Sequence, residues 1–98
     1  MARFTFAYDL HGVTDRSIYD SISRDILSTN STVKILNTTY LISGNYNAST
    51  VGAWLKKILE KYVHEQNFEY VVFQVTDYDY WLRRETISKL PQVGIAVA

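Results

Sequence analysis

Two chemically capable side chains follow the first apolar stretch of the chain, in "AYDLHG" at residues 7–12. A carboxylate such as that of Asp9 and an imidazole such as that of His11 can both bind metal ions and exchange protons. If the strand continues to residue 11, the spacing of two puts both side chains on one face. Asp9 therefore has three interpretations: a site, a seam between two copies, or a strand end that faces solvent.

Further polar residues of interest lie at other points of the chain. Asp77 and Asp79 in "TDYDYW" form a second acidic pair, whose alternation with tyrosine fits metal ligands but equally fits an ordinary loop. Arg83 and Arg84 form a local basic dipeptide, and Arg16 is the basic side chain that soon follows the first strand pattern. We expect these three arginines to contact phosphate if the protein binds nucleic acid.

Two remaining candidates have simpler interpretations. His64 falls on the polar side of a helical pattern and is expected to be exposed. Trp81 is expected to anchor the C-terminal tail on the domain rather than to stack on a base.

The composition narrows the class of protein. The chain has 98 residues, which predicts a single domain over 1–98. Ten basic and ten acidic residues give a formal net charge of zero, which argues against binding nucleic acid by bulk charge but allows a local basic stripe. The absence of cysteine excludes disulfides, thiolate zinc sites and a cysteine nucleophile. With no apolar stretch of membrane-spanning length and no secretion signal, we expect a cytoplasmic protein that does not enter membranes.

Hydrophobic periodicity predicts the elements that must position these residues. Residues 3–10 alternate as a strand, and 14–28 have helical spacing with Thr14 as the expected N-cap. Residues 33–44 are expected to form two short strands around a turn at Asn37-Thr38, with one bent strand as the alternative. An amphipathic helix at 50–66 and a strand at 69–76 follow. The last expected elements are an irregular or short helical piece at 80–89, broken by Pro91, and strand character in 92–98.

This order, β-α-β-β-α-β, predicts an α+β fold of the ferredoxin-like type. It consists of a four-stranded antiparallel sheet with two helices on one face. The core spans about residues 3–77, and 78–98 form a C-terminal extension. In the last strand, Val71, Phe73 and Val75 are expected to face the helices. The uncovered face is expected to carry Thr5, Ala7, Asp9, Tyr70, Val72, Gln74 and Thr76. Such a semi-apolar face suits a second copy of the chain, to whose edge strand the tail could add.

Two short motifs resemble a known family. "FAYDL" at 6–10 and the hairpin "NTTYLISG" at 37–44 are similar to those of the small CRISPR-associated endonuclease subunit that acts in spacer acquisition, and of the related ferredoxin-like RNase toxins. The resemblance covers about residues 3–77. It implies a homodimer in which the aspartate that ends the first strand, here Asp9, lies near the two-fold axis. The two copies of Asp9 would bind one divalent metal, Mg²⁺ or Mn²⁺, for phosphodiester hydrolysis.

The sequence leaves two functions nearly even. The first is a homodimeric nuclease-like domain with Asp9 as the catalytic carboxylate, Asp9 and His11 as metal ligands, and RNA or DNA as partner. In the CRISPR complex this subunit is thought to serve largely as a scaffold, so whether the present chain is catalytic stays open. The second function is a non-catalytic module that binds a protein partner. A small-molecule regulatory domain with its ligand near Gly12 ranks third.

Overall fold

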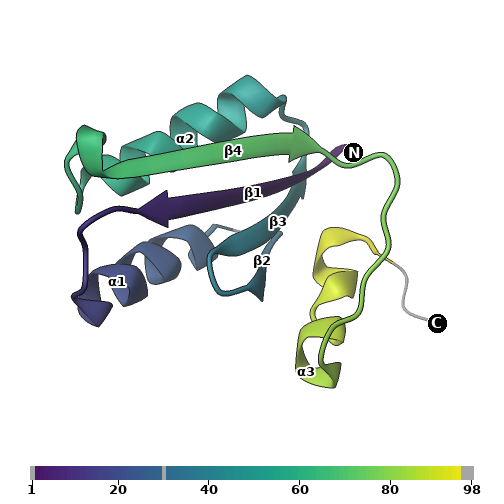
Figure 1. Cartoon of the computed structure of the whole chain (residues 1–98). Coiled ribbons are helices and arrows are strands. Elements are labelled where there is room, and N and C mark those ends of the chain that lie inside the picture. Colours follow the sequence, from purple (N-terminus) through teal and green to yellow (C-terminus); the bar gives the residue numbers. More distant parts are fainter. Residues whose placement is uncertain (1, 30, 96–98) are drawn as a thin grey trace.

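The chain folds as a four-stranded antiparallel sheet with both long helices on one face (Figure 1). The structure is a computed structural model that describes residues 2–29 and 31–95. Its elements are β1 (Ala2–Leu10), α1 (Arg16–Leu27), β2 (Thr32–Leu36), β3 (Thr39–Gly44), α2 (Ala48–Glu60), η1 (Glu65–Asn67), β4 (Phe68–Gln74), α3 (Arg84–Ile87) and η2 (Leu90–Val93). The strand order is β2-β3-β1-β4. The predicted α+β, ferredoxin-like architecture is confirmed.

The main core lies between the sheet and the two long helices. Alternate residues of β1, from Phe4 to Leu10, face this core, as their alternation predicts. The ring of Phe6 stacks on that of Tyr40 with centroids 5.4 Å apart. Helices α1 and α2 contribute isoleucine and leucine side chains at helical spacing. Burying each apolar side chain of this size stabilises the fold by about 1.5–3 kcal/mol. The buried side chains of β1 therefore hold this strand firmly against the helices.

Side-chain caps define where the helices begin. The carboxylate of Asp15 accepts a hydrogen bond from the Ser17 backbone N–H at 2.9 Å, so Asp15 is the N-cap of α1 and the expected Thr14 is wrong by one residue. Asn47 caps α2 in the same way, through the Thr50 N–H at 2.8 Å. Helix α2 ends at Glu60, earlier than the predicted 66, and the chain then turns into η1 and β4.

The expected orientation of β4 is wrong. Val71 and Phe73 are 50% and 62% exposed, while Tyr70 and Val72 pack against the main core. The pairing with β1 explains the reversal, because Ala7 lies opposite Val71 and directly opposed residues share a face. Bulky apolar residues occupy both faces of "EYVVF", so alternation alone could not choose between them. The open face of these two strands carries Thr5, Ala7, Asp9, Glu69, Val71 and Phe73.

The C-terminal extension covers the other half of the open face. Val33 and Leu41 point away from the helices and form a second buried cluster with Leu90, Val93 and Ile95 of the extension. Figure 1 shows the extension beside β2 and β3. It is held there by Arg3, whose side chain donates to the Val93 carbonyl at 2.9 Å and the Gly94 carbonyl at 2.6 Å.

Two expectations for this extension are wrong. Trp81 is fully exposed, and the buried Leu90 and Val93 anchor the extension in its place. Residues 92–95 contain no strand, because η2 and a turn at Gly94 (φ +77°) occupy them. The rest of that expected strand, 96–98, lies outside the described residues. No helix within the described ranges has both the length and the apolar composition needed to cross a membrane.

Candidate metal and anion sites

Three exposed side chains with metal-binding atoms converge where β1 ends and β4 begins. Asp9 lies opposite Glu69 in the strand pair. The His11 backbone N–H donates to the Asn67 carbonyl at 2.8 Å, which ties the residue after β1 to the turn before β4. The His11 Nε2 atom then lies 3.5 Å from a Glu69 carboxylate oxygen. One ligand atom from each of Asp9, His11 and Glu69 lies within 4.8 Å of the other two.

The structure thus brings the predicted Asp9 and His11 together and adds Glu69, which sequence reasoning missed. The predicted fold could have pointed to Glu69, because the first and last strands are neighbours in the ferredoxin-like sheet. The end of the first strand must then lie beside the start of the last. What the sequence lacked was the register that puts Glu69, and not Tyr70, opposite Asp9.

The donor set fits a divalent cation. Two carboxylates suit Mg²⁺ and Mn²⁺, which prefer oxygen ligands, and Mg²⁺ takes one or two such ligands and retains several waters. The His11 imidazole supplies a nitrogen donor beside them. The side chains of His11 and Glu69 are 55% and 70% exposed, so waters can complete the coordination. Asp77 and Asp79 lie outside this cluster. Each accepts a hydrogen bond from the backbone N–H of the next residue. These contacts agree with the interpretation of the pair as ordinary loop residues.

A polar cleft of about 520 Å³ borders Asp9 on the side of α1 and β2. Arg16 at the start of α1 and Lys34 of β2 supply its positive charge, while Asp9 and Asp20 supply carboxylates. The ammonium of Lys34 lies 5.9 Å from the centroid of the Tyr40 ring, a distance at which a cation–π attraction helps to hold it. The cleft therefore offers cations for an anionic group directly beside the acidic cluster.

A second polar cleft, of about 660 Å³, continues from Lys34 toward the C-terminal extension. Arg83 and Lys89 line it together with Lys34, and none of the lining residues is acidic. Of the three arginines expected to contact phosphate, Arg16 and Arg83 thus lie in clefts that share Lys34, whereas Arg84 lines neither. Sequence reasoning missed Lys34 and Lys89, because they become neighbours only when the extension folds onto β2.

His64 lies apart from both clefts. It is exposed, as expected, and its ring nitrogen accepts the Gln66 N–H at 3.2 Å to cap η1. Burial raises the pKa of Tyr8, which lines the cleft beside Asp9, and the adjacent Tyr40 adds to this shift. The raised pKa keeps the Tyr8 hydroxyl protonated to a higher pH than that of an exposed tyrosine.

Comparison with known proteins identifies the fold. No family model matches the chain, and no curated protein sequence matches it significantly. Among the solved structures that it does match is the crystal structure of Streptococcus pyogenes Cas2 at pH 6.5, with a TM-score of 0.54 and 12% sequence identity. The match covers 74% of this chain and 84% of the Cas2 chain. The resemblance in "FAYDL" and "NTTYLISG" is therefore supported at the level of a Cas2-like fold.

Proposed function

We propose that the protein is a homodimeric, nuclease-like domain that processes or scaffolds nucleic acid. Asp9, His11 and Glu69 would hold a divalent cation such as Mg²⁺ or Mn²⁺. The observation that carries the proposal is the position of these three side chains, within 4.8 Å of one another, beside a cleft that contains Arg16 and Lys34. Phosphodiester chemistry needs both parts, a cation and a binding place for the anionic backbone.

Each residue has a defined role in this proposal. The carboxylates of Asp9 and Glu69 would hold the cation, with the His11 imidazole as a third ligand. A bound divalent cation supplies an activated water and stabilises charge on the phosphate. Arg16 and Lys34 bind the phosphodiester next to Asp9. Arg16 is well suited to this, because a guanidinium makes paired hydrogen bonds to phosphate oxygens.

The second cleft extends the phosphate-binding surface. The cleft is lined by Lys34, Arg83 and Lys89 and by no acidic residue. Its local charge is therefore positive, although the net charge of the whole chain is zero. A nucleic-acid strand that passes Asp9 would place its next phosphates against Arg83 and Lys89. This arrangement explains how a chain of zero net charge can bind a polyanion.

The open face of β1 and β4 supports self-association. Val71 and Phe73 are the exposed apolar residues of this face, and Asp9 and Glu69 lie on the same face. Two copies joined through it would bury the two apolar side chains and bring the two acidic clusters toward each other. This geometry agrees with the family resemblance, which implies a dimer with the strand-end aspartate near the two-fold axis.

A nuclease assay tests the proposal. Wild type and Asp9→Ala are incubated with single-stranded RNA and with duplex DNA in Mg²⁺ or Mn²⁺. Asp77→Ala serves as the control, since Asp77 is also an exposed acid but lies outside the cluster. We expect metal-dependent cleavage by wild type and the control and none by Asp9→Ala. Cleavage that survives Asp9→Ala would remove Asp9 from the mechanism.

A second candidate is a non-catalytic module that binds a protein partner. The exposure of Val71 and Phe73, together with the zero net charge, favours it. Retention on immobilised RNA or DNA distinguishes the two functions. Salt-sensitive retention supports nucleic-acid binding, whereas no retention, combined with no cleavage where a related enzyme cuts, supports the protein-binding module.

A further inference from the structure

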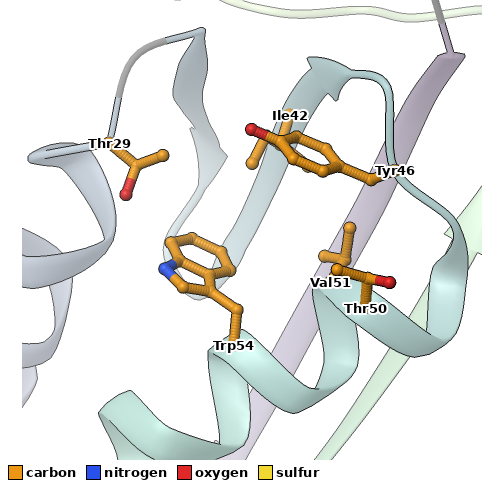
Figure 2. Close-up of a pocket in the computed structure, with 6 residues that line it drawn as sticks. All are labelled: Thr29, Ile42, Tyr46, Thr50, Val51 and Trp54. Carbon is orange, nitrogen blue, oxygen red and sulfur yellow. The ribbon is translucent and has the colours of Figure 1, made fainter.

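A small apolar pocket lies between the helices and β3, apart from the acidic cluster and the basic clefts. Figure 2 shows its six lining side chains, which come from the turn after α1, from β3, from the following loop and from the first turns of α2. They are Thr29, Ile42, Tyr46, Thr50, Val51 and Trp54. The pocket holds about 210 Å³ and is partly open to solvent. None of these residues takes part in the function proposed above.

Each aromatic side chain of the pocket makes a packing contact with a neighbouring residue. The Tyr46 ring lies directly against the backbone of Gly44, in space that the Cβ atom of any other residue would enter. The Trp54 ring meets Phe6 edge to face, with centroids 5.6 Å apart and an interplanar angle of 88°. Because each ring already packs against a neighbour on one side, a ligand would lose less affinity to the ordering of these walls than it would on free side chains.

The lining selects for an uncharged ligand. The pocket surface is almost entirely carbon, and no lysine, arginine, histidine, aspartate or glutamate lines it. Ile42 and Val51 are each only 2% exposed and belong to the main core, so one side of the pocket is rigid and apolar. A charged molecule would lose its hydration here without gaining an ionic partner.

The size and the two rings select for a flat molecule. An apolar cavity of about 150 Å³ accommodates benzene, so about 210 Å³ accommodates one ring or two fused rings. Figure 2 shows the Tyr46 and Trp54 rings on different sides of the pocket. Aromatic groups prefer offset-stacked or edge-to-face contacts with other rings, and these two walls offer such contacts.

We propose that this pocket binds a small, neutral, planar aromatic molecule of one or two rings, of the indole type. The site does not rest on the nuclease-like function, since it shares no residue with the acidic cluster or the basic clefts. The proposed pocket ligand is therefore independent of whether this protein cuts nucleic acid.

The test is a two-dimensional NMR titration of the full chain with indole. We expect saturable shifts of the Thr50 and Val51 amides and of the Trp54 indole N–H, with a dissociation constant below about 1 mM, an affinity well within the ligand-efficiency ceiling for a molecule of this size. Cyclohexanol is the non-planar probe and should bind about two- to tenfold more weakly, because it cannot make ring-to-ring contacts. Equal binding of the two probes would overturn the aromatic specificity.

Two variants locate the site. Thr29→Phe fills the pocket from its edge, and Tyr46→Ala removes one wall. Each should weaken indole binding at least about tenfold. Tyr78→Ala is the matched control, since Tyr78 is 49% exposed and Tyr46 43% exposed, but Tyr78 lies in the C-terminal extension. Amide spectra show whether each variant is folded.

Three results would overturn the proposal. They are no saturable shift in the wild type, shifts confined to residues outside the pocket, and indole affinity that is the same in both folded variants as in the control. Binding of N-acetyltryptophanamide without binding of free indole would also overturn it, because the pocket would then accept a partner's side chain and not a small molecule.

Discussion

Asp9 and Glu69 lie directly opposite each other on the exposed face of the β1–β4 pair. Two carboxylates in this position repel each other, and like charges opposed across strands destabilise a sheet. The His11 imidazole lies 3.5 Å from Glu69 at the same end of the strand pair. A divalent cation bound by the two carboxylates would offset their repulsion, so this pair links the stability of the sheet to metal binding.

The first prediction concerns this repulsion. Without divalent cations, Asp9→Asn removes one of the two charges and should stabilise the protein by about 0.2–1 kcal/mol. Added Mn²⁺ should raise the Tm of the wild type, since a ligand that binds only the folded state stabilises it. The increase should be much smaller in Asp9→Asn and Glu69→Gln, as measured by calorimetry.

The matched control for the metal effect is Asp77→Asn, whose carboxylate lies outside the cluster. It should keep the full Mn²⁺-dependent increase in Tm. An equal increase in all four proteins would show that Mn²⁺ stabilises the fold without using Asp9 or Glu69.

The second prediction concerns pH and the contact between α1 and the residues that directly follow α2. The Tyr62 hydroxyl donates to an Asp25 carboxylate oxygen at 2.6 Å, and Lys61 lies 3.3 Å from the same oxygen. The Tyr62 hydrogen bond is the main cause that lowers the pKa of Asp25. A lowered pKa in the folded state adds stability above the unfolded-state pKa, and that stability is lost as the pH falls through the folded-state pKa.

Tyr62→Phe should therefore reduce the free energy of unfolding more at pH 7 than at an acidic pH below the folded-state pKa of Asp25. Urea unfolding at the two pH values measures the difference, and Tyr78→Phe, in the C-terminal extension, is the control. A loss of the same size at both pH values would mean that Tyr62 stabilises the protein without acting through the charge of Asp25.

The main architecture could be predicted from sequence because its patterns are local. Phe4 and the apolar residues at every second position after it have only one way to face a core, and the spacing of Val51, Leu55 and Ile58 fits only a helix. The turn at Asn37-Thr38 likewise lies where the chain reverses direction between β2 and β3.

The site was only partly predictable because its parts come from distant segments. Asp9 and His11 are close in sequence, but Glu69 joins them through a strand register that the apolar run "EYVVF" leaves ambiguous. Lys34 and Lys89 meet only because the extension buries Leu90 on the sheet. Long-range packing decides such contacts, and no local periodicity encodes it.

The third prediction concerns self-association through the open face. Phe73→Asp puts a charge on the exposed apolar part of β4 and should convert a dimer into a monomer, because a buried, unpaired carboxylate is costly. Leu36→Asp is the control, since Leu36 is 58% exposed and Phe73 62% exposed, but Leu36 lies on β2. Sedimentation equilibrium measures the mass. A wild type that is monomeric at high concentration would contradict the proposed dimer.

The last prediction concerns the basic cleft between β2 and the extension. Arg83→Ala and Lys89→Ala should each weaken binding to RNA or DNA and lower the salt dependence of binding by about one unit of slope, as expected when one phosphate contact is lost. Arg84→Ala should change neither quantity, because Arg84 is exposed but does not line the cleft. The adjacent position of Arg83 and Arg84 makes this a strict comparison, and fluorescence anisotropy over a range of salt concentrations measures it. Equal effects at the two arginines would show that binding responds to total charge and not to the cleft.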